Sequence, residues 1–228
     1  MSEAVIIAVD GPAGSGKSSV CRGTAAALAL RYLDTGAMYR AMTCAVLEAE
    51  IDPSDASAVA AFAAIPKIIS GTDPLAPTIF VDGVDVAIPI RSESVTSAVS
   101  PVSAVPEVRE RLVALQREHV AQARAANVGI VVEGRDIGTV VLPDAGLKVY
   151  LTADPAVRAA RRAAETGTDA VAATEASLKA RDAYDSSRMT SPLTQADDAV
   201  VVDTTEMTLQ QVIDHVCDLV NERREKHV

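Results

Sequence analysis

Residues 11–18 of this chain read Gly-Pro-Ala-Gly-Ser-Gly-Lys-Ser, and few sequence patterns restrict a fold as strongly. The segment matches the phosphate-binding pattern G-x-x-x-x-G-K-[ST] at every fixed position. Residues 5–9 before it are apolar and rich in β-branched side chains, which is typical of a strand buried on both faces of a parallel sheet. Residues 18–30 after it contain good helix formers and no proline, which predicts a helix. Strand, glycine loop and helix therefore follow in the order that a phosphate-binding loop requires, and a glycine turn without a ligand is the alternative.

Such a loop binds phosphate mainly through its backbone. Glycines allow the N–H groups to turn inward around phosphate oxygens, and the N-terminus of the following helix adds the positive end of its dipole. We predict that Lys17 reaches the β- and γ-phosphates of a nucleotide and that the Ser18 hydroxyl binds Mg²⁺.

The composition indicates an ordinary globular enzyme that needs no disulfide bond or metal ion to stabilise its core. The 228 residues, 49% of them hydrophobic, suffice for one α/β domain with a small insertion. Cys21, Cys44 and Cys217 show no disulfide or zinc spacing, and neither do the three histidines. No apolar run approaches a membrane span and the N-terminus lacks a basic signal region, so we expect a cytoplasmic protein.

The net charge of −10 bears on the partners of this chain. An excess of acidic residues argues against general binding of nucleic acid or an anionic membrane. An anionic substrate must therefore be held by a local cluster of cationic side chains.

The rest of the chain alternates between strand-like and helix-like segments. We predict further strands at residues 32–34, 130–132, 148–151 and 199–202, and helices at residues 37–50, 106–126 and from 209 onward. This alternation predicts a five-stranded parallel sheet flanked by helices. Residues 51–106 contain most of the prolines and short strand-like pieces, with a hairpin expected between residues 65–69 and 78–81, so we interpret them as an insertion. The core domain then comprises residues 1–50 and 107–228.

Polar residues follow two of these strands, at the sheet edge where ligands of parallel α/β proteins bind. Residues 34–40 place Thr35 at an expected helix N-cap and Arg40 one turn later. Residues 133–139 hold Glu133, Arg135 and Asp136 between glycines, which is costly unless the charges meet a ligand or one another.

Two sets of arginines come later in the chain. Arg158, Arg161 and Arg162 lie at i, i+3 and i+4, so one helical face is expected to present three guanidinium groups. Arg181, Asp185 and Arg188 share a second face at i, i+4 and i+7. Each set neutralises charge during phosphoryl transfer or, alternatively, belongs to a solvated helix with surface ion pairs. Because the chain lacks the N-K-x-D signature for guanine, a small-molecule kinase is favoured over a G-protein switch.

In combination these motifs resemble those of the bacterial cytidylate kinases, a family of nucleoside monophosphate kinases. The resemblance runs from residues 10–17 and 33–40 through Ile90-Arg91, residues 106–109 and residues 133–141 to Arg181-Asp182, Asp185, Arg188 and Pro192-Leu193, which covers nearly the whole chain. Three positions depart from the pattern: Thr35 stands for a serine, Ala87 for a hydroxyl residue and Tyr184 for a basic residue of some members. These departures put contacts of the insertion in doubt, but not the activity.

The resemblance implies a phosphate-loop kinase fold in which residues 51–106 belong to the CMP-binding region and about residues 155–170 form a short lid. It implies transfer of a phosphoryl group from ATP to CMP or dCMP, with Mg²⁺ and with Lys17, Arg158, Arg161 and Arg162 as catalytic residues. The ATP-binding residues would be Gly11, Pro12, Ala13, Gly14, Ser15, Gly16, Lys17, Ser18 and Ser19. The acceptor-binding residues would be Thr35, Tyr39, Arg40, Ser100, Arg109, Arg135, Asp136, Arg181, Asp185 and Arg188. We expect a monomer; a monophosphate kinase of other or broader base preference and a nucleotide-dependent switch are the alternatives.

Overall fold

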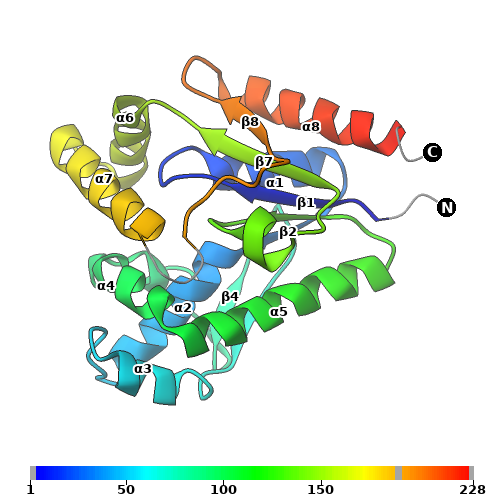
Figure 1. The fold of residues 1–228 in the computed structure, drawn as a ribbon. Helices are drawn as coiled ribbons and strands as arrows, with labels where there is room; N and C mark the ends of the chain where they lie inside the picture. Colours follow the sequence, from blue (N-terminus) through cyan, green and yellow to red (C-terminus); the bar gives the residue numbers. More distant parts are fainter. Residues whose placement is uncertain (1–3, 188–191, 226–228) are drawn as a thin grey trace.

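The computed structural model describes residues 4–187 and 192–225, and its centre is a five-stranded parallel sheet (Figure 1). The strand order is β2 (Arg31–Asp34), β6 (Ile130–Glu133), β1 (Ile6–Asp10), β7 (Leu147–Thr152) and β8 (Val200–Asp203). All four pairings between neighbouring strands are parallel. The predicted sheet is thus confirmed, with strand ends displaced by at most about one residue.

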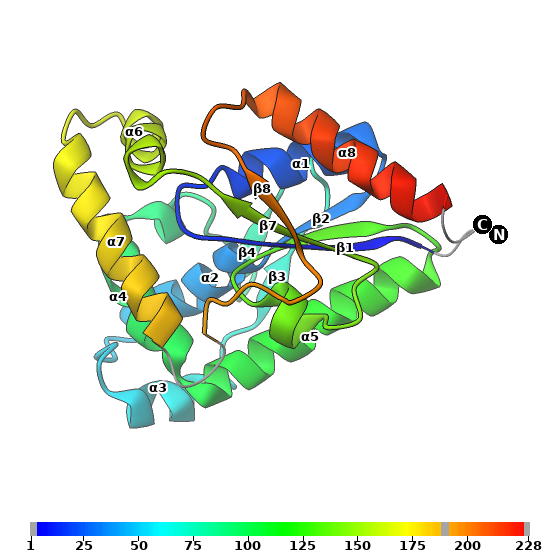
Figure 2. The same cartoon turned by 45° about the horizontal axis from the view of Figure 1, so that its top comes forward.

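Both faces of this sheet are buried, because the alternate side chains of each strand enter different apolar cores. Ile7 and Val9 of β1 pack with α1 (Lys17–Ala27) and α8 (Leu209–Glu225). Ile6 and Ala8 pack on the opposite face, which α2 (Thr35–Glu48) and α5 (Pro106–Ala125) cover. Figure 2 shows the sheet between these two layers of helices.

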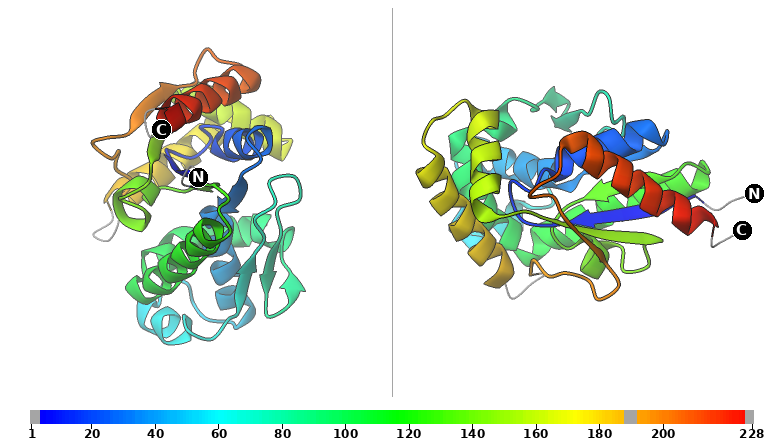
Figure 3. Two further views of the ribbon diagram at one scale, coloured as in Figure 1. Left: turned by 90° about the vertical axis from the view of Figure 1, so that its right-hand side faces the viewer. Right: turned by 90° about the horizontal axis from the view of Figure 1, so that it is seen from above.

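The insertion contains the predicted hairpin but also two helices that the sequence analysis missed. β3 (Ile68–Ser70), β4 (Ile79–Val81) and β5 (Val84–Asp85) form an antiparallel sheet. α3 (Ala56–Phe62), the 3₁₀ turn η1 (Pro89–Arg91) and α4 (Glu93–Ala104) flank it. The left view of Figure 3 shows the insertion on the α5 side of the sheet, away from α8.

The expectation of only strand-like pieces in this region was therefore wrong. Asp55 caps α3, and Ser92 caps α4 by accepting from the Val95 N–H. α4 is rich in serine, threonine and valine and contains Pro101, a composition that disfavours a helix. Burial of Val95 and Val102 in the core shared with α2, together with burial of Val99, outweighs that weak propensity.

Two helices, α6 (Pro155–Thr166) and α7 (Val171–Ser187), follow β7 and cover the segment expected to form the lid. Gly167 ends α6 in the left-handed conformation with φ of 65°. Figures 1 and 3 show α6 and α7 side by side at the end of the sheet toward which β1 and β7 run. They therefore lie beside the loops that follow the parallel strands, where a ligand is expected.

Candidate active site

The glycine loop between β1 and α1 adopts a conformation that only glycine tolerates at its first position. Gly11 has a φ of 148°, and a Cβ there would lie 2.0 Å from the carbonyl oxygen of Leu151. Within the loop, the Lys17 ammonium donates to the Pro12 carbonyl at 2.7 Å and to Ser15 Oγ at 3.3 Å. Burial, followed by repulsion from Arg135, lowers the pKa of Lys17 to about 7. The loop therefore already encloses the cation that the sequence analysis assigned to a nucleotide's phosphates.

Oxygen ligands suited to a magnesium ion lie at the start of α1. Ser18 Oγ donates to Glu133 Oε1 at 2.7 Å, and the buried Glu133 Oε2 has no hydrogen-bond partner among the described residues. Burial and then the charge of Asp34 raise the pKa of Glu133 to about 8. A hydroxyl and nearby carboxylates are the hard oxygen ligands that Mg²⁺ prefers, with substrate phosphates and water completing its shell. These residues fit Mg²⁺, although the part of the chain that the structure describes has no group of three or more His, Cys, Asp or Glu side chains able to hold a metal alone.

Four arginines from four separate segments converge beside this loop: Arg40 of α2, Arg135 after β6, Arg162 of α6 and Arg181 of α7. We call them the arginine cluster. Burial and then repulsion from Arg162 lower the pKa of Arg40 to about 10. Burial and then repulsion from Arg135 and Arg40 lower the pKa of Arg181 to about 10. Because the four cations repel one another, the cluster is complementary to a polyanion.

Hydrogen bonds hold these arginines in place. Arg40 Nη1 donates to the Ile90 carbonyl at 3.0 Å and to Thr96 Oγ1 at 2.9 Å, which ties the cluster to the insertion. Arg135 Nη1 donates to the Gly11 carbonyl at 2.5 Å, and its Nε lies 3.4 Å from Asp185 Oδ2. The buried Nε of Arg181 has no hydrogen-bond partner among the described residues and remains available as a donor.

A second group of polar side chains, which is shielded from solvent, lies between α2, α5 and the loop after β6. The carboxylate of Asp136 forms a buried ion pair with Arg109, whose guanidinium carbon lies 5.4 Å from the centre of the Tyr39 ring. Ser100 of α4 is half-buried one turn before Ser103, whose carbonyl accepts from Arg109 Nη1 at 3.3 Å. These residues, remote in sequence, therefore form one polar group enclosed by protein.

One local prediction at this site was wrong. Thr35 is the first residue of α2 and not its N-cap; Asp34 holds the cap position and accepts from the Ala37 N–H at 2.8 Å. The Thr35 hydroxyl instead donates to the Glu133 carbonyl at 2.7 Å. Aspartate and threonine both occur as helix N-caps. Here the Thr35 hydroxyl bonds to the end of β6, and the Asp34 carboxylate caps the helix.

The three arginines of α6 do not form the single cationic face that their spacing predicts. Arg158 is 7% exposed and donates to the carbonyls of Ala13 and Ala153 and to Asp182. Arg161 donates to Thr204, in the loop that follows β8. Arg162, which pairs with Glu165, is the one of the three that belongs to the arginine cluster as defined above. Catalytic roles for Arg158 and Arg161 stay predictions, and Arg188 lies outside the described residues.

A cavity of about 340 Å³ opens beside the glycine loop. Its walls include Ser15, Gly16 and Ser19 of the loop and helix α1, Arg161 of α6, and Thr204 and Met207 after β8. Three of the predicted ATP-binding residues, Ser15, Gly16 and Ser19, thus share one cavity with Arg161. The sequence analysis missed Thr204 and Met207, because neither belongs to a motif.

Asp10 and Glu133 are two further site residues to which the sequence analysis assigned no role. Asp10 accepts from the Ile137 and Gly138 N–H groups at 2.8 and 2.7 Å, which fixes the turn after Asp136. Burial raises the pKa of Asp10 to about 6. Each residue ends a buried strand with an acidic side chain, and that position was the signal that could have identified them.

The comparisons with known proteins agree with this geometry. A model of the family described as cytidylate kinase matches residues 7–222. The chain belongs to the cytidylate kinase family. A cytidylate kinase of Streptomyces avermitilis is 62% identical over 222 residues, which are 97% of this chain and 94% of that relative. The cytidylate kinase of Mycobacterium avium is 52% identical over 99% of both chains.

The likeness to solved structures concerns the fold alone. A gluconokinase from Sinorhizobium meliloti superposes with a TM-score of 0.52 at 14% identity, covering 99% of this chain and 97% of its own. The fold is therefore that of a phosphate-loop kinase. The family match and the named relatives show that this chain is an enzyme that phosphorylates nucleotides. In the described part of the chain, no helix is both long and apolar enough to cross a bilayer.

Proposed function

We propose that this enzyme transfers the γ-phosphoryl group of ATP directly to a phosphate oxygen of CMP or dCMP, which yields ADP and CDP or dCDP. The observation that carries the proposal is the arginine cluster, which adjoins the phosphate loop on one side and the buried Arg109–Asp136 pair on the other. A polyanion-binding site between a donor loop and an enclosed polar group fits the phosphates of two nucleotides. The names of the relatives support cytidine as the acceptor base.

The donor would lie along the glycine loop. Lys17 and the loop N–H groups would bind its β- and γ-phosphates, and the cavity lined by Arg161, Thr204 and Met207 would take its nucleoside end. Ser18, with Glu133 near it, would hold Mg²⁺, which when bound neutralises charge on the transferred group.

The acceptor would lie beneath α4 and α7. The Asp136 carboxylate would accept from the exocyclic amine of cytosine, which uracil lacks, with Arg109 and Ser100 beside it. Thr35 and Tyr39 would line the acceptor nucleotide, while Arg181 and Asp185 would hold its ribose and Arg40 and Arg135 its phosphate.

In the chemical step, a bond forms between the acceptor phosphate oxygen and the γ-phosphorus while the bond from that phosphorus to the β–γ bridging oxygen breaks. The acceptor is already ionised at neutral pH, so no general base is required. The protein must align two groups that repel each other and neutralise the charge that spreads over the transferred phosphoryl group. Lys17 and Arg162 would supply that field, and α6 would help to exclude water as a competing acceptor.

The test is ADP release by the purified protein with ATP and Mg²⁺, measured in parallel with CMP, dCMP, UMP, AMP and GMP. We expect release that depends on CMP or dCMP and exceeds release with the other monophosphates by at least about tenfold, as a buried polar contact to one base permits. Equal ADP release with all five monophosphates would contradict the proposal and indicate a monophosphate kinase of broad base preference. Slow release that no acceptor stimulates would replace it with a nucleotide switch.

A further inference from the structure

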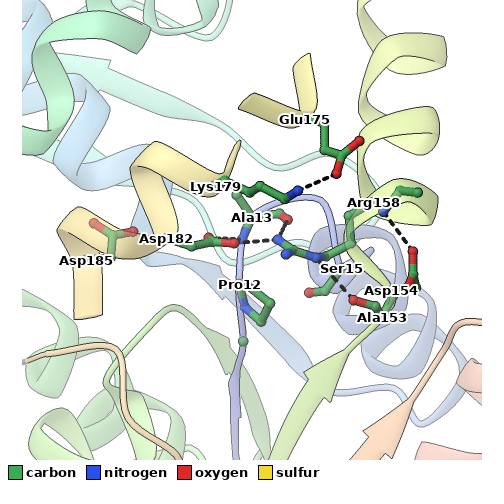
Figure 4. Close-up of polar contacts among 12 residues, drawn as sticks. Pro12, Ala13, Ser15, Ala153, Asp154, Arg158, Glu175, Lys179, Asp182 and Asp185 are labelled. Atoms are coloured by element: carbon green, nitrogen blue, oxygen red, sulfur yellow. Dashed lines mark hydrogen bonds and ion pairs between the residues drawn. The ribbon is translucent and has the colours of Figure 1, made fainter. Parts of the chain in front are cut away.

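Three segments meet at one residue of the phosphate loop, Ala13, and Figure 4 shows the polar part of this contact. The Ala13 N–H donates to Asp182 Oδ1 of α7 at 3.1 Å, and the Ala13 carbonyl accepts from Arg158 Nη1 of α6 at 2.9 Å. Arg158 Nη1 also lies 2.5 Å from Asp182 Oδ2. The Ala13 side chain packs with Ala159 and Leu178 in a small apolar cluster. We call these five residues the Ala13 junction.

The junction is tightly built. The Arg158 side chain is 8% exposed and that of Asp182 17% exposed, so solvent screens their ion pair only weakly. Arg158 Nε also donates to the Ala153 carbonyl at 3.2 Å, and this further hydrogen bond restricts the orientation of the guanidinium group. A Cβ on Gly14 would lie 2.9 Å from the Arg158 carbonyl oxygen, so the loop and α6 are in backbone contact.

Helix α7 brings acceptor-site residues to this junction. Arg181 of the arginine cluster directly precedes Asp182. Asp185 follows Asp182 by three residues and is therefore its neighbour on the helix surface. Asp185 pairs with Arg135, which donates to the Gly11 carbonyl of the same loop. Asp182 thus attaches α7 to the phosphate loop directly at Ala13, and Asp185 attaches it at Gly11 through Arg135.

We propose that Asp182 is a positioning residue that sets the place of Arg181 relative to the phosphate loop, and so aligns the acceptor with the donor phosphate. The proposal rests on the function proposed above. Asp182 would touch neither nucleotide; it acts through the Ala13 N–H and Arg158. A misplacement of about 1 Å in such an alignment costs about 100-fold in rate.

The decisive variant is Asp182→Asn, which keeps the shape of the side chain and removes its charge. We expect kcat with ATP and CMP to fall by about 10- to 100-fold while each KM changes less than about threefold, because binding groups remain but their alignment is lost. Asp182→Glu, which keeps the carboxylate, should recover most of the lost kcat. An unchanged kcat in Asp182→Asn, or a loss confined to KM, would overturn the proposal.

Glu175→Gln is the matched control. Glu175 pairs with Lys179 at 2.6 Å on the same helix, with side chains 29% and 61% exposed (Figure 4), and among the described residues no hydrogen bond connects Glu175 to the loop. This variant also removes one carboxylate and one ion pair from α7, and we expect its kcat to match the parent. An equal loss of kcat in Glu175→Gln would mean that α7 stability, and not the Ala13 junction, sets the rate.

Hydrogen exchange without nucleotides separates failure of this inference from failure of the proposed function. Asp182→Asn should increase exchange in peptides covering residues 11–16 and 155–166, and Glu175→Gln should not. A parent protein without CMP-dependent ADP release contradicts the proposed function, whatever the exchange shows. Unchanged exchange in an Asp182→Asn protein that melts as the parent does contradicts the junction itself.

Discussion

Replacing Asp136 by asparagine removes one charge from the buried pair that this carboxylate forms with Arg109 and leaves the Arg109 cation enclosed. The two side chains are 5% and 4% exposed, so water screens the remaining charge poorly. Removing one partner of such a pair costs about 3–5 kcal/mol. Arg109 keeps its bond to the Ser103 carbonyl and its contact with the Tyr39 ring, which places the expected loss near the lower limit, about 3 kcal/mol.

For a chain of this length each kcal/mol lowers the melting temperature by about 2–4 °C, so Asp136→Asn should melt about 6–12 °C below the parent. The assay is a double-mutant cycle with Arg109→Met, in which both single variants and the double variant are unfolded in urea. Since the double variant retains neither charge, we expect it to be about 2 kcal/mol more stable than the sum of the single losses predicts.

The same proteins test the role of Asp136 in base recognition. The ratio of kcat/KM for CMP to that for UMP should fall at least about tenfold in Asp136→Asn, because the amide exchanges one of the two accepting oxygens for an NH2 donor that can pair with the O4 atom of uracil. Losses of stability that add within about 0.5 kcal/mol would show that the ion pair contributes nothing specific. An unchanged CMP to UMP ratio would remove Asp136 from base recognition.

Three further predictions concern the phosphate loop and its surroundings. Lys17→Met should lower kcat by at least about 100-fold without lowering the melting temperature, because burial depresses the lysine pKa and the charge is a cost to folding; a lower melting temperature would contradict this. Burial raises the pKa of Asp10 to about 6 from an ordinary value of 3.8, so the folded protein binds this proton more tightly than the unfolded chain does. Its contribution to the free energy of unfolding should therefore decline by about 3 kcal/mol as the pH rises from about 4 to about 6. Urea unfolding of the parent and Asp10→Asn at pH 4 and 7.5 measures this, and a stability difference between the two proteins that is the same at both pH values would contradict it. Ser18→Ala should raise the Mg²⁺ concentration for half-maximal ADP release by at least about tenfold, and an unchanged Mg²⁺ titration would remove Ser18 as a ligand.

Local patterns predicted the elements whose own composition decides them. The apolar β-branched runs at β1, β6 and β7 leave no alternative to buried strands, and Gly11 with Lys17 specifies the loop between β1 and α1. α4 was missed because serine, threonine and valine are weak helix formers and Pro101 lies within it, whereas the alanine-rich α3 spans only 7 residues, which is too short for a helix to be stable by itself. Their helical state depends on packing against α2 and α5, which no window of sequence contains.

The candidate site also contains some residues that local sequence patterns identified and others whose contacts they did not predict. The residues of the phosphate loop and the acidic and basic residues at strand ends were identifiable from the sequence, because parallel strands bring their carboxyl ends to one edge. Thr35, by contrast, was assigned a cap that Asp34 supplies, and the α6 arginines were assigned one face that the structure divides among three partners. Helical spacing shows which side chains lie near one another along a helix, but not which groups they meet across it.

The amino-acid order alone was therefore enough for the phosphate loop, the parallel sheet and the class of chemistry, since each rests on residues adjacent in the chain. Folding was needed to bring Arg40, Arg135, Arg162 and Arg181 together, to enclose Arg109 with Asp136, and to join Asp182 to Ala13. Asp182 and Ala13 are 169 residues apart in the chain, and no local pattern links them. Charges so distant in sequence become a binding site only when the fold removes water from between them and holds them at hydrogen-bonding distance.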